Sequence, residues 1–390
     1  MKQLTVCLVA ALTLLLLMGC PPASQSKKKL KPLFRITSVL DTGQEPSFLV
    51  TEDFNLDGNL DLVVLNSAED TFSVFQGNGD GTFQDQVQYK TGAGPICIAV
   101  ADFNSDGFKD IAELNYRDQN IQIFMNTGRG GFRNTGKIIK PGRIPINLTA
   151  GDFNEDGYPD LAVSLRYYKV AILLGRGTGK FKDPVAMQVK GQPTGLVVGD
   201  YNHDQHVDVA VALAGSGNVG VEILWGNGKG EFEQSQLFKG GGQPLTIANV
   251  DANNDGFTDL VTSSNSLHAM TMMLNNKDKT FTTLRDFSAG EFPKFVAVGD
   301  FTGDGIADLA VSNATKDTVA VTQGRGDGTF TYPPIDHYVD EYPQGLVTGD
   351  FNKDGRMDLV VSCRDKNLLT VMLRKNIRIT RPATPQSAPS

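Results

Sequence analysis

Apolar runs of five or six residues, separated by turns rich in glycine, asparagine and aspartate, follow one another along almost the whole chain. Examples are ICIAVA at 96–101, LAVSL at 161–165 and VAILLG at 170–175. Their length and their β-branched residues are typical of β-strands, and the 3.6-residue period of an amphipathic helix is absent from these repeated segments. The pattern therefore predicts an all-β protein.

The turns between these runs recur at a nearly constant distance. An acidic nine-residue segment occurs seven times, and its first residues are 48 to 51 positions apart. The copies are DFNLDGNLD (53–61), DFNSDGFKD (102–110), DFNEDGYPD (152–160), DYNHDQHVD (200–208), DANNDGFTD (251–259), DFTGDGIAD (300–308) and DFNKDGRMD (350–358). A proline stands seven residues before each copy. A period near 50 residues predicts a stacked or radial array of similar units.

Each unit contains four predicted strands, and the third leads into a glycine-rich turn that ends in phenylalanine, as in GNGDGTF (77–83). Four short strands in about 50 residues is the pattern of a β-propeller blade. The seventh unit lacks such a phenylalanine, whereas Phe34 stands 12 residues before Pro46, at the spacing seen elsewhere. We therefore predict a seven-bladed β-propeller of four-stranded blades over 34–376. The N-terminal strand 34–40 would complete the last blade and close the ring.

The acidic segments place oxygen-bearing side chains at regular positions. Aspartate recurs at positions 1, 5 and 9, usually with asparagine at 3 and glycine at 6, a set that suits the oxygen ligands and tight turn of a calcium loop. The predicted ligands of up to seven structural Ca²⁺ ions are Asp53, Asn55, Asp57, Asp61, Asp102, Asn104, Asp106, Asp110, Asp152, Asn154, Asp156, Asp160, Asp200, Asn202, Asp204, Asp208, Asp251, Asn253, Asp255, Asp259, Asp300, Thr302, Asp304, Asp308, Asp350, Asn352, Asp354 and Asp358.

A metal-free turn, in which these side chains bond backbone amides, is the alternative to a calcium loop. The segment 200–208 is the weakest candidate, because Gln205 replaces the glycine and must adopt a positive φ. In the sixth segment Thr302 replaces asparagine, and weaker binding is expected there.

The two ends of the chain lie outside the repeats. Residues 1–19 combine a charged start with a long apolar stretch and are predicted to be a secretory signal peptide. The ending LMGC (17–20) resembles the lipobox of bacterial lipoproteins, in which Cys20 is lipidated; a plain signal peptide and an uncleaved anchor are the alternatives. We expect 20–33 to be a tether, 377–390 to be a disordered tail, and the protein to be exported and attached to the cell envelope through lipid alone.

The order of proline, apolar strand, D-x-N-x-D-G-x-x-D, second strand and G-x-G-x-F resembles the FG-GAP/VCBS repeats of integrin α-subunit heads and of many bacterial exported proteins. The resemblance covers about 34–376. It implies that the calcium loops lie on one face and stiffen the blades. It leaves the function open, because the same propeller serves adhesion, lectins and accessory modules of enzymes.

Recognition is expected where the repeats differ. Loops on the side opposite the calcium loops carry, in blades two and three, Tyr116, Arg117, Arg143, Arg166, Tyr167 and Tyr168. Aromatic and arginine side chains are enriched at binding surfaces, although an ordinary solvated rim is the alternative. We expect a non-catalytic, monomeric scaffold that binds a protein or a polysaccharide. A lectin is one alternative, and a polysaccharide-degrading enzyme or its accessory module is another.

Few other residues suggest chemistry. A net charge of −8 argues against nucleic acid as a partner. His203 and His206 are either a soft-metal pair or solvated loop residues. Glu113 stands where the other repeats carry valine or threonine, and a buried carboxylate there needs a partner or a raised pKa. Cys97 and Cys363 fall in separate blades and are expected to be free, buried thiols.

Overall fold

The computed structural model describes residues 31–215, 220–264 and 266–376. Chain contacts separate Met1–Lys31 from Pro32–Ser390, and the second unit holds every described strand. The expected signal peptide, Cys20, most of the tether and the tail lie outside the described residues. Within the described ranges, no helix is long and apolar enough to cross a membrane.

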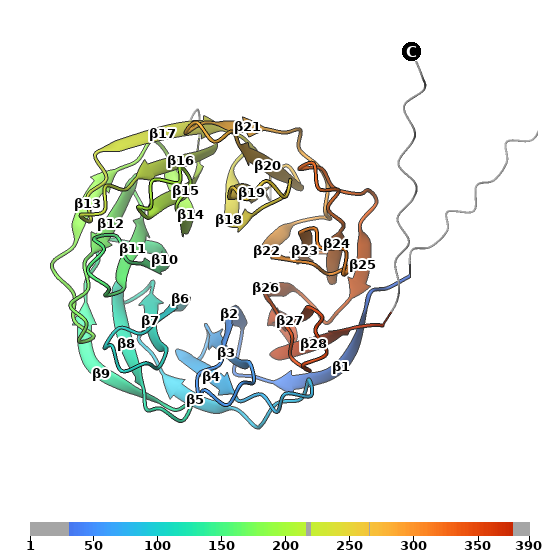
Figure 1. The fold of residues 1–390 in the computed structure, drawn as a ribbon. Coiled ribbons are helices and arrows are strands. Elements are labelled where there is room, and N and C mark those ends of the chain that lie inside the picture. Colours follow the sequence, from blue (N-terminus) through green and yellow to red (C-terminus); the bar gives the residue numbers. More distant parts are fainter. Residues whose placement is uncertain (1–30, 216–219, 265, 377–390) are drawn as a thin grey trace, which may run out of the picture. The chain divides into compact units, whose positions relative to one another are not determined.

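Seven sheets of four antiparallel strands form the blades of a ring (Figure 1). Blade one contains β2 (Pro46–Glu52), β3 (Asp61–Asn66), β4 (Thr71–Phe75) and β5 (Val87–Lys90). Blade two contains β6 (Pro95–Ala101), β7 (Asp110–Asn115), β8 (Asn120–Asn126) and β9 (Phe132–Ile139). Blade three contains β10 (Pro145–Gly151), β11 (Asp160–Leu165), β12 (Lys169–Leu173) and β13 (Val185–Gln188). Blade four contains β14 (Gln192–Gly199), β15 (Asp208–Ala214), β16 (Gly220–Trp225) and β17 (Gln234–Lys239).

The other three blades repeat this order, and the last one uses both ends of the propeller. Blade five contains β18 (Pro244–Val250), β19 (Asp259–Ser264), β20 (Ala269–Asn275) and β21 (Phe281–Thr283). Blade six contains β22 (Pro293–Gly299), β23 (Asp308–Asn313), β24 (Thr318–Thr322) and β25 (Ile335–Tyr338). Blade seven contains β26 (Pro343–Gly349), β27 (Asp358–Cys363), β28 (Leu368–Arg374) and β1 (Phe34–Asp41), with the short 3₁₀ turn η1 (Arg364–Lys366) between β27 and β28.

The hydrophobic core is divided among the gaps between blades. The second and third strands of a blade are almost entirely buried, as in β3 and β4, whereas an outer strand such as β5 is largely exposed. Strand β7 of blade two and β11 of blade three contribute Leu114 and Leu161 to one cluster. Because both faces of the second and third strands are buried, their sequences are almost continuous apolar runs.

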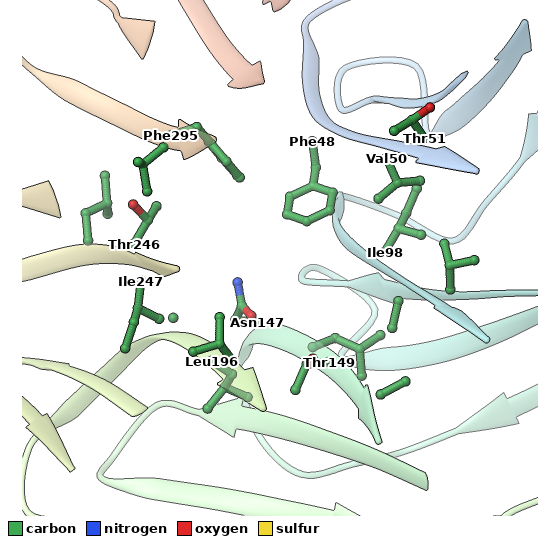
Figure 2. A pocket seen from close by; sticks show the side chains of 18 residues that line it. Phe48, Val50, Thr51, Ile98, Asn147, Thr149, Leu196, Thr246, Ile247 and Phe295 are labelled. Carbon is green, nitrogen blue, oxygen red and sulfur yellow. The ribbon is translucent and has the colours of Figure 1, made fainter. Parts of the chain in front are cut away.

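The first strand of each blade faces the middle of the ring and begins at, or one residue before, its proline (Figure 1). Proline lacks the N–H that a strand interior would use, so the start of a strand tolerates it, and a bulge follows directly in every blade. These inner strands surround a central cavity of about 420 Å³ (Figure 2).

The N-terminal strand closes the ring, as predicted. Strand β1 pairs antiparallel with β28 from Phe34 opposite Arg374 to Asp41 opposite Leu368. Strand β2 of blade one in turn contacts β26 of blade seven. The all-β, seven-bladed architecture expected from the repeats is thereby confirmed.

Aromatic pairs join consecutive blades on the side of the acidic loops. In five blades the phenylalanine that ends the third-strand turn packs edge-to-face on the aromatic residue at position 2 of the preceding blade's acidic loop, and Phe34 makes the same contact in blade seven. The pairs are Phe83–Phe351, Phe132–Phe54, Phe181–Phe103, Phe232–Phe153, Phe281–Tyr201 and Phe34–Phe301, with ring centroids 5.3 to 6.3 Å apart. Phe34 therefore supplies the aromatic contact of blade seven in this series. The exception is Phe330, which faces a loop with Ala252 at position 2 and stacks on Phe287.

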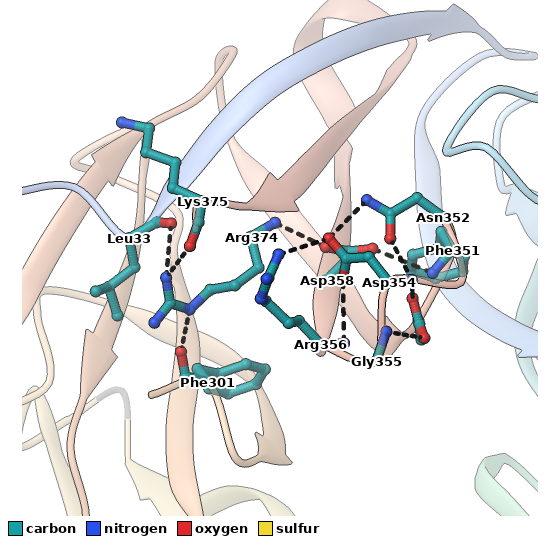
Figure 3. A network of polar contacts seen from close by, with 11 residues as sticks. Leu33, Phe301, Phe351, Asn352, Asp354, Gly355, Arg356, Asp358, Arg374 and Lys375 are labelled. Carbon is teal, nitrogen blue, oxygen red and sulfur yellow. Dashed lines mark hydrogen bonds and ion pairs between the residues drawn. The ribbon is translucent and has the colours of Figure 1, made fainter. Parts of the chain in front are cut away.

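A hydrogen bond to the backbone carbonyl at position 2 accompanies every one of these junctions. The donor is a glycine-turn N–H in four blades, and in the remaining three it is a side chain: Gly81, Gly179, Gly230, Gly328, Asn126, Asn275 and Arg374. Blade seven has no glycine-rich turn, because its outer strand comes from the other end of the chain. The Arg374 guanidinium replaces that turn and donates to the carbonyls of Phe301, Leu33 and Lys375 (Figure 3).

Candidate functional site

The acidic loops are organised by hydrogen bonds from their own backbone. In the first loop the N–H of Asp57 donates to both Asp53 Oδ1 and Asn55 Oδ1, at 3.1 and 3.0 Å, and the N–H of Gly58 donates to Asp53 Oδ2 at 2.8 Å. Position 6 has φ between 73° and 89° in all seven loops, as its glycine predicts, and Gln205 adopts φ 73°. Position 4 is also left-handed in every loop, which the sequence did not indicate because non-glycine residues such as Leu56 occupy it.

The aspartate at position 9 connects the acidic loop to the glycine-rich turn of its own blade. Asp61 is fully buried; its carboxylate accepts the N–H of Phe54 at 3.1 Å and that of Gly77 at 2.9 Å. Equivalent pairs of bonds recur in the second to fifth loops. In blade seven, which lacks a glycine-rich turn, the second donor is the N–H of Arg374, and in the sixth loop Asp308 accepts only the N–H of Gly324 in this way. Burial raises the pKa of these carboxyl groups, to about 6 for Asp61, Asp110, Asp160, Asp259 and Asp358 and to about 7 for Asp208 and Asp308.

The loops offer the kind of donor set that calcium requires, although the position-9 carboxylate points its oxygens at backbone N–H groups. Among the described residues, no three carboxylate, imidazole or thiol groups converge as a ready-made metal cluster. In five loops the oxygens at positions 1 and 3 nevertheless share one target, the N–H at position 5. In the third loop Asp152 Oδ1 is buried and has no hydrogen-bond partner among the described residues. An all-oxygen set with one unsatisfied carboxylate oxygen fits a hard cation. The predicted calcium ligands at positions 1, 3, 5 and 9 all accept backbone N–H groups or lie beside them, and each carboxylate oxygen keeps a further lone pair with which it could bind the ion.

Basic side chains compete for the position-5 carboxylate in three loops. Lys279 lies 3.8 Å from Asp204, and Lys277 lies 3.3 Å from Asp255. In the seventh loop Arg356 lies 2.9 Å from Asp354 (Figure 3). Within the described ranges, the position-5 carboxylates of the first three loops have no such ion pair. Loops one to three are therefore the most favourable for a cation.

The two histidines of the fourth loop do not form a pair. His206 Nδ1 lies 2.5 Å from Glu155 of the third loop, and this carboxylate raises the pKa of His206. The His203 ring instead stacks on Phe257 of the fifth loop, with ring centroids 3.8 Å apart. The two rings contact different blades, so a soft-metal site built from both is not present in this arrangement.

The six rim residues expected to bind a ligand lie together on the face opposite the acidic loops, because the loop after a blade's second strand and the loop before its first strand both emerge there. We call Tyr116, Arg117, Arg143, Arg166, Tyr167 and Tyr168 the blade-two/three rim. Gln119 Oε1 accepts the N–H of Ile144 at 3.1 Å, and Ile144 O accepts the N–H of Arg166 at 2.9 Å. These two bonds make the loops of blades two and three one continuous surface.

The two tyrosines of blade three are exposed and lie in a turn that is left-handed in other blades as well. Tyr167 and Tyr168 are 60% and 49% exposed and have φ of 65° and 62°, a left-handed conformation that costs a non-glycine residue on the order of 1 kcal/mol. Bonds from the N–H of Tyr167 to Gln192 Oε1 and from the N–H of Val189 to Tyr168 O hold them there. The structure thus presents two adjacent phenol side chains to solvent.

The blade-two/three rim differs from the corresponding loops of blades six and seven in how its charged side chains are paired. Among the ion pairs of the described residues, none involves Arg117, Arg143 or Arg166. The corresponding loops of blades six and seven are paired internally, through Lys316–Glu291, Lys366–Glu341 and Arg364–Glu45. The blade-two/three rim therefore offers three arginines whose positive charge is not already satisfied by a carboxylate.

Two expectations about buried groups can be compared with the structure. Glu113 is fully buried, and its Oε2 accepts a hydrogen bond from Asn115 at 2.7 Å. Its Oε1 has no hydrogen-bond partner among the described residues, and burial raises the pKa of the carboxyl well above its usual value. No arginine of blades two or three contacts Glu113 in the described chain. Cys97 and Cys363 are free and buried, as expected.

The fold and the recurring contacts between neighbouring blades define a propeller built from seven copies of one repeat, each with an acidic loop. A model of the family described as FG-GAP-like repeat matches residues 53–113, 114–163, 206–262, 251–311 and 300–361. These segments make up more than half of the chain, and the chain belongs to the FG-GAP-like repeat family.

The other comparisons bear on the fold. No curated protein sequence matches this chain. The chain is similar to solved structures of BBS1N in complex with ARL6DN, one soaked with lead and one with mercury. The first has a TM-score of 0.63 at 12% identity and covers 89% of this chain and 98% of that chain. The second has a TM-score of 0.62 with the same identity and coverage. At this identity the likeness shows the fold alone.

Proposed function

We propose that the protein is a non-catalytic binding scaffold of the cell envelope that attaches to an acidic polysaccharide through the blade-two/three rim. An FG-GAP-like propeller fits a binding or adhesion role. The observation that carries the proposal is one continuous surface with three exposed tyrosines and three arginines that form no ion pair with a carboxylate of the described residues.

The chemistry of these side chains favours acidic sugars over neutral ones. A guanidinium forms paired hydrogen bonds with a carboxylate, in a geometry that fixes the orientation of the partner. A tyrosine ring presents a flat, apolar face with a hydroxyl at its tip, which suits the face and the edge of a sugar ring. The backbone bonds that hold Tyr167 and Tyr168 reduce the conformational entropy lost when a ligand binds.

Calcium is proposed as the structural partner of the opposite face. Loops one to three would hold it most tightly, because no lysine or arginine of the described residues forms an ion pair with their position-5 carboxylates. A bound ion stabilises the folded state over the unfolded state by mass action. Export and a lipid anchor at Cys20 remain part of the proposal and rest on the first twenty residues.

A binding survey with the purified protein tests this function. Polygalacturonate, hyaluronan, neutral dextran and a panel of envelope proteins would be compared by isothermal titration and pull-down at low ionic strength. Binding to the carboxylated polymers alone supports the proposal. Equal binding to dextran would favour a lectin for neutral sugars, and capture of a protein without polysaccharide binding would favour a protein scaffold.

A further inference from the structure

The inner strands of the seven blades carry similar residues at one position and dissimilar residues at the position just before it. Three residues after each proline stands a branched aliphatic residue that packs between blades: Leu49, Ile98, Leu148, Leu196, Ile247, Val296 and Leu346. Two residues after each proline the repeats carry Phe48, Cys97, Asn147, Gly195, Thr246, Phe295 and Gly345. The agreeing residues of five blades line the central cavity, and so do five residues of the differing position, which give the cavity a lining that changes from blade to blade.

The variable position shapes an asymmetric cavity. Figure 2 shows Phe48, Asn147, Thr246 and Phe295 around the same opening. The rings of Phe48 and Phe295 meet edge-to-face, with centroids 5.4 Å apart, although blade seven lies between their blades. They can meet because blade seven carries Gly345 at this position, where an added Cβ would lie 2.3 Å from Ser47 O. The aromatic pair therefore forms one wall, and Asn147 stands opposite it.

The polar side chains of the cavity are few, and two half-buried ones have no hydrogen-bond partner among the described residues. Thr246 Oγ1 bonds Ser263 at 2.8 Å, and Thr51 Oγ1 donates to Asp61 O at 2.8 Å. The side chains of Asn147 and Thr149 make no hydrogen bond with another described residue, and both line the cavity. No titratable side chain is among the lining residues. A charged ligand would lose hydration there without meeting an opposite charge.

We propose that the central cavity is a binding site for a small neutral molecule with an aromatic or alkyl body and one amide- or hydroxyl-like group. The apolar body packs against Phe48 and Phe295, and the polar group exchanges hydrogen bonds with the Asn147 amide and the Thr149 hydroxyl. The volume of about 420 Å³ lies within the range of small-molecule sites. This site is separate from the blade-two/three rim and is independent of the polysaccharide proposal.

Titration with N-phenyl-1-naphthylamine tests the proposal. This neutral probe carries two aromatic groups around one N–H, and its fluorescence increases in apolar surroundings. The informative variant is Asn147→Phe, because the chain already holds phenylalanine at the same repeat position in blades one and six. Asn147→Leu removes the amide at similar volume. Tyr338→Ala, a substitution at a 76% exposed outer-strand residue, is the matched control for probe on the surface.

We expect the wild-type protein to bind one probe molecule per chain with a saturable rise in fluorescence. Asn147→Phe should weaken binding by at least about tenfold. Asn147→Leu should weaken it by roughly fivefold, the effect of one hydrogen bond. Tyr338→Ala should leave it unchanged, and all variants should melt cooperatively. Absence of saturable binding to the wild type, full binding to Asn147→Phe, or loss of binding in Tyr338→Ala would each overturn the proposal.

Discussion

His337 Nε2 accepts a hydrogen bond of 2.8 Å from the backbone N–H of Leu33, immediately before the strand that closes blade seven. The same nitrogen accepts the N–H of Phe34 at 3.2 Å, and Nδ1, 3.3 Å from Val319 O, carries the proton. The ring is 6% exposed, and burial lowers the pKa of His337 to about 4, with the positive charges of Lys375 and Arg374 acting in the same direction. A neutral imidazole thus joins blade six to the closing strand.

Acid should weaken this junction. Between pH 6.5 and 4 the unfolded chain binds a proton at His337 that the folded chain does not, so stability present above pH 6.5 is lost as the pH falls. The shift from 6.5 to about 4 corresponds to about 3 kcal/mol. The measurement is urea unfolding of the wild type and His337→Gln from pH 7 to 4; the difference between them removes the opposite contribution of the buried aspartates. Parallel pH curves for the two proteins would contradict this role of His337.

Arg374 should carry more stability than other arginines at the closure. Arg374→Met leaves the carbonyl of Phe301 without this donor, at a cost of about 1–3 kcal/mol, whereas Leu33 O keeps the N–H of Lys375 at 2.8 Å. Arg364→Met is the matched control, because Arg364 pairs with Glu45 at the surface, and such pairs contribute less than about 1 kcal/mol. Chemical denaturation compares the two. Equal losses would show that Arg374 does not replace the missing glycine turn.

Calcium should raise the melting temperature, and excess chelator should lower it. At a free calcium concentration of 100 times Kd, one site contributes about 2.7 kcal/mol. Asp156→Ala should remove one tight site in a calorimetric titration, because Asp156 forms no ion pair with a basic side chain in the described ranges. Asp354→Ala should leave the number of tight sites unchanged, since Arg356 already engages that carboxylate. A melting temperature that is indifferent to chelator would contradict calcium stabilisation.

Glu113→Val should stabilise the protein at neutral pH. Valine occupies this position in most repeats, and the substitution removes a buried carboxyl group with one unpartnered oxygen. Because the folded-state pKa is raised, the wild type loses stability as the pH rises through it, so the advantage of valine should be larger at pH 8 than at pH 5. We expect about 1–3 kcal/mol at pH 8 by urea unfolding. A less stable variant at both pH values would indicate a partner that Glu113 needs.

The number of blades could be predicted from the seven acidic segments, and the closure of the ring from the spacing between Phe34 and Pro46. Phe34 keeps the spacing of its counterparts, and its ring makes the contact with Phe301 that the other phenylalanines make with the preceding blade. The glycines at position 6 of the acidic loops, such as Gly58, likewise predict the positive φ found there.

Other features depend on contacts that carry no repeated residue. Position 4 of the acidic loops holds residues as different as Leu56 and Lys353, so its left-handed backbone could not be inferred from side-chain type. Nothing in the sequence around Arg374 resembles a glycine turn, and the replacement becomes visible only when Phe301 is placed next to it. His203 and His206 are neighbours in sequence, but a turn directs them to different blades.

The most direct test of the account is the affinity of the rim for polygalacturonate. Isothermal titration would compare the wild type, Arg143→Ala/Arg166→Ala and Arg129→Ala/Lys353→Ala; the last pair changes the net charge equally but lies on the calcium-loop face. If each arginine bonds a carboxylate, the rim variant should bind about 100-fold more weakly. The calcium-face variant should bind as the wild type does. Equal affinity of the rim variant and the wild type, or equal weakening of both variants, would contradict recognition by the blade-two/three rim.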